Sequence, residues 1–141
     1  MTLVSLLSVF CISLMSVAEP LSLEMALEAA NTGNVQILKK YSAEQSNLNK
    51  QNNRGINLLM QAAASGQTNV IDYLLQQKVD LELKTSEGDT AVVMAITNDQ
   101  DAIAEKLIKA GAKKEITNGD GKKPLDLAKE IQNEEAIKLL K

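Results

Sequence analysis

The apolar residues of the chain fall into short blocks separated by polar turns, and similar blocks return at a fixed interval. Three positions keep a spacing of 33 residues: Gly55, Gly88 and Gly121; Ala62, Ala95 and Ala128; and Leu74, Leu107 and Leu140. An earlier block at 27–38 follows the same pattern one interval upstream. A constant period of about 20 to 50 residues is typical of a stack of small repeated units. The pattern therefore predicts an array of repeats.

Each interval is predicted to contain two short helices joined by a tight turn. In the second unit the first helix is expected over 58–64 and the second over 68–77, where apolar residues form one stripe at Val70, Ile71, Leu74 and Leu75. Helices this short are marginal alone, because nucleation is costly and few backbone bonds are gained. We therefore expect the units to be stable only when they stack on one another.

Residues that begin or end helices support these boundaries. Asn57 and Thr90 are expected to accept hydrogen bonds from free backbone amides at the start of the first helices. Gly66 suits the turn at 65–67, since glycine adopts the left-handed conformation at low cost. In the next unit Asp99 takes its place, and Gly111 is expected to end the second helix.

The first 18 residues differ from the rest of the chain. Residues 2–18 carry no charge, so all 15 basic and 18 acidic residues lie after them. We expect a secretory signal peptide over 1–18, because Ser16 and Ala18 are small residues suited to a cleavage site before Glu19. No Lys or Arg precedes the apolar run, so an uncleaved anchor is the alternative. As a helix, these 17 residues would span about 26 Å of a hydrocarbon core of about 30 Å.

The inventory of reactive side chains is small. The chain has no histidine, and its one cysteine, Cys11, would leave with the signal peptide. A Ser-His-Asp arrangement, a thiolate nucleophile and a zinc-thiolate site are therefore not expected. Glu134 and Glu135 are neighbours on one helix and cannot converge. The sequence NGDGKK at 118–123 lacks the acidic ligands of a calcium loop and the spacing of a phosphate loop. We expect no enzymatic activity, no cofactor and no metal.

Composition and charge leave a binding role as the main class of function. The chain is 45% hydrophobic with a formal net charge of -3, as in one ordinary soluble domain. It has no long run of basic residues, so nucleic acid is not an expected partner. Once the signal peptide is removed, no contact with a membrane is expected either.

The repeated blocks resemble the ankyrin repeat family. The family pattern is Gly, any residue, Thr-Pro-Leu-His, any residue, Ala-Ala, two of any kind, and Gly. The corresponding segments here are GINLLMQAAASG at 55–66, GDTAVVMAITND at 88–99 and GKKPLDLAKEIQ at 121–132. No repeat keeps the histidine, and the Thr and Pro survive only as Thr90 and Pro124. The resemblance extends over nearly all of the chain after the leader.

This resemblance implies an all-α ankyrin-repeat solenoid over 19–141, with four helix-turn-helix units at about 22–51, 52–84, 85–117 and 118–141. It also implies loops that project from one edge and a concave surface formed by the loops and the first helices. Family members bind proteins through that surface. The family's usual contact positions correspond here to Gln51, Asn53, Arg54, Ile56, Ala64, Ser65, Lys84, Ser86, Glu87, Asp89, Thr97, Asn98, Thr117, Asp120 and Lys122.

The sequence therefore indicates a non-catalytic protein-binding module of the periplasm or exterior, which we expect to be a monomer. Export, small size and a mildly acidic surface suggest an immunity or inhibitor protein that neutralises a toxin or enzyme. The alternative is a helper scaffold for a periplasmic stress-defence enzyme such as a catalase. The sequence leaves the identity of the partner open.

Overall fold

The computed structural model describes residues 19–141, so the predicted signal peptide lies outside the described residues. Residues 19–141 contain eight α-helices and no strand. The helices form four pairs: α2 (Leu23–Thr32) with α3 (Val35–Glu44), α4 (Leu58–Ser65) with α5 (Thr68–Gln76), α6 (Ala91–Thr97) with α7 (Asp101–Lys109), and α8 (Pro124–Glu130) with α9 (Glu134–Leu140). The expected all-α stack of four helix pairs is confirmed.

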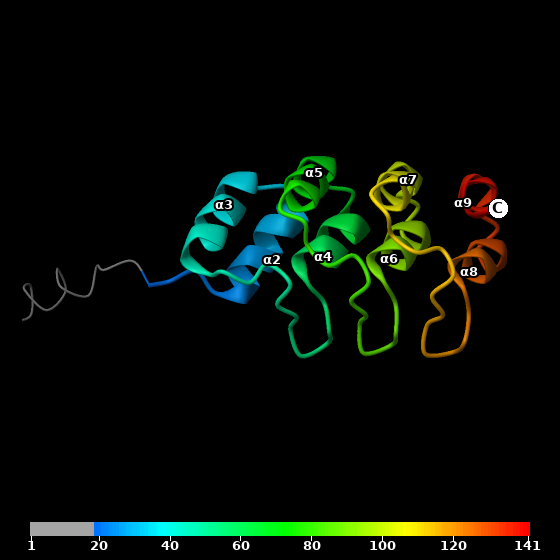
Figure 1. Ribbon diagram of the computed structural model, residues 1–141, viewed down its shortest axis with the longest axis horizontal. Coiled ribbons are helices and arrows are strands. Elements are labelled where there is room, and N and C mark those ends of the chain that lie inside the picture. The colour runs from blue at the N-terminus through cyan, green and yellow to red at the C-terminus, as the bar shows by residue number, and fades with distance from the viewer. Residues whose placement is uncertain (1–18) are drawn as a thin grey trace, which may run out of the picture.

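The pairs stand side by side in two layers (Figure 1). The first helices α2, α4, α6 and α8 form one layer, and the second helices α3, α5, α7 and α9 form the other. Three long loops project beyond the layer of first helices, all on the same side (Figure 1). We call them finger 1 (residues 45–57), finger 2 (residues 77–90) and finger 3 (residues 110–123).

Small residues allow the first helices to pack closely. The alanines at their contacts are buried: Ala26, Ala29, Ala30, Ala62, Ala63, Ala95 and Ala128. Leucines of the second helices fill the space between the two layers, and Leu38, Leu74 and Leu107 are fully buried. These residues belong to one core that continues through all four pairs. Each unit therefore depends on its neighbours for burial, as short helices require.

The predicted helix caps are partly correct. The Asn57 side chain accepts a hydrogen bond from the Met60 N–H at 2.9 Å, which confirms it as the cap of α4. The prediction for Thr90 is wrong, because no side-chain bond caps α6. Thr90 is only 2% exposed, and among residues 19–141 its hydroxyl has no hydrogen-bond partner. The helix starts at the predicted place without its predicted cap.

Helix ends differ from the expected ones by one or two residues. Ser65 belongs to α4 and not to the turn, and α5 ends at Gln76. Gly66 has φ 75° and Asp99 has φ 57°, so both turns use the left-handed conformation as expected. The helix α7 ends at Lys109, two residues before Gly111. These shifts are of the size by which frayed helix ends commonly vary.

Candidate functional site

The three fingers end in tips that are built alike. The Asn52 side-chain oxygen accepts from the N–H groups of Arg54 and Ile56, both at 3.0 Å. One interval later, the Thr85 hydroxyl accepts the equivalent pair at 3.3 and 3.2 Å. In finger 3, Asn118 does the same at 3.0 Å for both bonds. Because one side chain ties both ends of each tip, the tips keep a defined shape.

Neighbouring tips are joined by main-chain hydrogen bonds. The Ser86 N–H of finger 2 donates to the Arg54 carbonyl of finger 1 at 3.0 Å. The Gly119 N–H of finger 3 donates to the Glu87 carbonyl of finger 2 at 2.8 Å. A side chain at Gly88 would meet the Gly119 backbone, so this contact requires glycine. The three fingers therefore form one connected row.

A second set of bonds braces the row through two of the predicted contact residues. The Gln51 side-chain amide donates to the carbonyls of Gly55 at 2.6 Å and Lys84 at 2.8 Å. The Lys84 ammonium donates to the Thr117 carbonyl at 2.8 Å. Gln51 and Lys84 occupy equivalent positions, 33 residues apart. Both side chains hold neighbouring fingers together, so they shape the surface in addition to lining it.

Five predicted residues lie around one small hollow between fingers 1 and 2. The hollow has a volume of about 110 Å³, and its lining includes Arg54, Ile56, Ser86, Glu87 and Asp89. These side chains come from two tips and from the segments that lead into α4 and α6. The remaining lining residues are Thr85 and Met94.

Sequence reasoning missed two residues of this hollow, Thr85 and the apolar Met94. Met94 is the one that lies on a first helix. It is half-buried on α6 and packs against the core. A sequence signal existed, because Met94 lies 33 residues from both Gln61 and Leu127 on the other first helices. An exposed-side position repeated on every first helix is a candidate contact position. We call the surface formed by the tips and these first-helix positions the finger face.

The other predicted residues on the first helices lie farther from the tips. Ser65 and Thr97 are the last residues of α4 and α6, and Asn98 directly follows α6. The Ser65 hydroxyl donates to the Asn31 side chain of α2 at 2.6 Å, which links two units. Ala64 is half-buried beside it. These residues extend the finger face along the first helices and are not part of the hollow.

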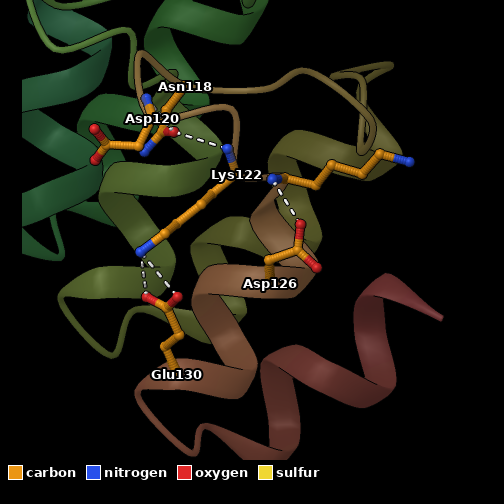
Figure 2. Close-up of polar contacts among 6 residues, drawn as sticks. Asn118, Asp120, Lys122, Asp126 and Glu130 are labelled. Carbon is orange, nitrogen blue, oxygen red and sulfur yellow. Dashed lines mark hydrogen bonds and ion pairs between the residues drawn. The ribbon is translucent and has the colours of Figure 1, made fainter.

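In finger 3, the predicted residue Lys122 already forms an ion pair with another residue of the chain (Figure 2). The Lys122 ammonium contacts both carboxylate oxygens of Glu130, at 2.8 and 2.9 Å. This hydrogen bond and the charge of Glu130 raise the pKa of Lys122 above its ordinary value. Asp120 is exposed at the tip, and Thr117 contributes its carbonyl to the brace from Lys84. Finger 3 therefore offers one free acidic tip beside an internal ion pair.

Residues 19–141 contain no cluster of three or more His, Cys, Asp or Glu side chains that could hold a metal ion. No helix in the same range is long and apolar enough to cross a membrane.

The repeat geometry agrees with a comparison against known families. A family model described as ankyrin repeats (3 copies) matches residues 26–118, well over half of the chain. The chain belongs to the ankyrin-repeat family. Ankyrin repeats are generally protein–protein interaction modules, and the family is typically non-catalytic. A comparison with curated proteins finds no match. The fourth helix pair, α8 with α9, follows the end of the matched segment and packs on α6 and α7.

Proposed function

We propose that this ankyrin-repeat protein is a non-catalytic module that binds another protein through the finger face. The observation that carries the proposal is the hydrogen-bonded row of tips, which presents exposed Arg54, Ser86 and Glu87 around a half-buried Met94. A surface held in shape before binding loses little conformational entropy on association. Polar tips around an apolar centre also match the usual arrangement of interfaces, with a polar rim and a more apolar core.

The charges of the finger face favour a basic partner. Among the described residues, Glu87, Asp89 and Asp120 form no ion pair, whereas Lys122 and Lys123 of finger 3 are paired with Glu130 and Glu115. One oxygen of Asp89 is buried and has no hydrogen-bond partner within residues 19–141. An unpaired buried acceptor is costly, so a donor that enters the hollow is favoured. We expect a partner with a Lys or Arg cluster opposite fingers 2 and 3.

The test uses a double variant, Arg54→Ala with Glu87→Ala, against a matched control. Both substitutions keep the carbonyls that join the fingers, since those belong to the backbone. The control, Lys39→Ala with Glu134→Ala, makes the same charge change on exposed residues of the second helices. For a partner isolated with the wild-type protein, we expect the double variant to bind about tenfold or more weakly, as loss of a central contact implies. The control should bind within about twofold of wild type, as expected for substitutions outside the contact surface. Equal affinity for all three proteins would remove the finger face from the proposal.

The compartment and the biological role are further parts of the proposal. The uncharged residues 2–18 support export to the periplasm or exterior with cleavage before Glu19. The mass of the exported protein tests this, because a mass that includes residues 1–18 contradicts cleavage. The unpaired carboxylates at the tips of fingers 2 and 3 support an immunity or inhibitor role over that of a helper scaffold. An inhibitor lowers the activity of the captured partner on binding, whereas a helper for a stress-defence enzyme leaves that activity intact or preserves it.

A further inference from the structure

The first finger has an edge at which two hydrogen-bonding groups lack the partners that their equivalents have. In fingers 2 and 3, the N–H of Ser86 or Gly119 and the carbonyl of Lys84 or Thr117 both bond to the preceding finger. The equivalent groups in finger 1 are the Asn53 N–H and the Gln51 carbonyl, 33 residues upstream. No hydrogen bond from residues 19–141 reaches either group. They therefore form an open donor and acceptor pair on the N-terminal edge of the finger row.

A hollow lies directly against this edge. It has a volume of about 650 Å³ and is lined on one side by residues 50–53 of finger 1. The lining also includes residues 20–24, which contain the N-cap and the first residues of α2. Tyr41 also lines the hollow, and burial raises the pKa of its hydroxyl. The hollow is large enough for a short peptide segment and adjoins both open main-chain groups.

We propose that this edge binds a polar turn of a partner protein, which takes the place that a preceding finger would occupy. The contacts between neighbouring fingers indicate which residues such a partner turn needs. Gln51 and Lys84 each supply a long donor side chain, and the carbonyl that accepts the next bond lies three residues later, at Arg54 or Glu87. A fitting partner turn therefore has Lys or Gln followed three residues later by a free carbonyl. The side chain donates to the Gln51 carbonyl, and the partner carbonyl accepts from the Asn53 N–H.

Hydrogen bonding selects the occupant more strongly than net charge does. Glu24 and Lys50 lie on the lining, one charge of each sign, and neither forms an ion pair with another described residue. Main-chain groups left open at an edge are an established basis of peptide recognition, and bonds to them contribute to affinity. The site is separate from the hollow at Arg54 and Glu87, so it does not depend on the function proposed for the finger face.

A second copy of this chain fits the edge poorly. In a head-to-tail arrangement, finger 3 of one copy would meet finger 1 of the next, and the Asp120 carbonyl could accept from the Asn53 N–H. The donor position of finger 3 is Thr117, however, where fingers 1 and 2 have Gln51 and Lys84. The threonine side chain is too short to bridge to the next finger as those side chains do. A second copy would therefore make one of the two bonds, and a partner turn with Lys or Gln makes both.

The test follows the Asn53 amide by nuclear magnetic resonance in the full chain and in the chain that begins at Glu19. The probe is a synthetic peptide with the sequence LKTSEGDT of residues 83–90, the turn that fills the same edge of finger 3. At millimolar peptide we expect the Asn53 resonance to shift and its hydrogen exchange to slow about tenfold. The already bonded Ser86 and Gly119 amides should not change. A peptide with alanine in place of the lysine should bind more weakly.

A proline at residue 53 gives a variant that keeps the tip and removes the donor. Asn53 is the second residue of the turn closed by the Gly55 N–H and the Asn52 carbonyl at 2.9 Å, a position that favours proline. Asn53→Pro should fold with unchanged circular dichroism and lose peptide binding, which is then followed at the Leu21 and Leu23 amides. Peptide binding that survives Asn53→Pro, or no shift of Asn53 in either chain, would overturn the proposal. If the Asn53 amide is protected from hydrogen exchange without peptide, and only in the full chain, residues 1–18 occupy the edge. If this protection grows with protein concentration, a second copy of the chain occupies it. Each of these two results also overturns it.

Discussion

Replacement of Gly88 by alanine tests whether the fingers form one connected row. Gly88 has φ 85°, and a Cβ built there lies 3.0 Å from the Asn118 carbonyl carbon and closer still to the Gly119 nitrogen. Gly121 is the matched control, because it has φ 75° and nothing within 4 Å of its Cβ position. Both substitutions cost about 1 to 2 kcal/mol for a left-handed alanine. Only Gly88→Ala also displaces the Gly119 N–H from the Glu87 carbonyl.

The lost finger-to-finger hydrogen bond adds about 0.5 to 1.5 kcal/mol, so Gly88→Ala should destabilise by about 1.5 to 3.5 kcal/mol. Gly121→Ala should stay within about 1 to 2 kcal/mol. Urea unfolding followed by far-ultraviolet circular dichroism measures both, with the slope against urea compared to confirm that the same cooperative unit unfolds. Equal losses for the two variants would show that the contact between fingers 2 and 3 contributes nothing, and would refute the claim that finger 3 is part of one connected row.

Four further outcomes follow from the core, the caps and the buried tyrosine. Leu74→Ala should lower the free energy of unfolding by about 2 to 5 kcal/mol in urea titrations, whereas exposed Gln76→Ala on the same helix should change it by less than about 0.5 kcal/mol. Asn57→Ala should cost about 0.5 to 2 kcal/mol through loss of its cap bond. Thr90→Val should be neutral or stabilising, since its buried hydroxyl has no partner among residues 19–141. Burial and the charge of Glu24 raise the pKa of Tyr41 above its ordinary value, so its neutral form stabilises the fold below about pH 10 and that contribution is lost as pH rises further. Thermal melts should therefore show a larger alkaline loss for wild type than for Tyr41→Phe, and equal losses would exclude Tyr41 as the cause.

Part of the candidate site could be located from the sequence, because the resemblance to the ankyrin family indicates which repeat positions are its usual contact positions. Arg54, Ser86 and Glu87 were expected on the binding surface and lie around one hollow. The roles of Gln51 and Lys84 could not be predicted, since a bracing bond depends on the distance between adjacent fingers. A different limit applies within the last helix, where the spacing of Glu134 and Lys138 favours an ion pair between them, whereas the Lys138 ammonium contacts Glu135 at 3.0 Å. Side chains at both spacings are within reach on a helix, and rotamers decide between them.

The amino-acid sequence alone determined the period, the helix pairs and the positions of the turns. These features rest on local chemistry: apolar spacing within short helices, and residues such as Gly66 and Asp99 that accept left-handed backbone. Tertiary structure alone decided how the fingers join and which groups stay open at the Asn53 edge. Hydrogen bonds between residues 31 to 36 positions apart form only once the units have stacked. The distances between fingers, and with them the shape of the binding surface, are therefore a property of the assembled stack and not of any single repeat.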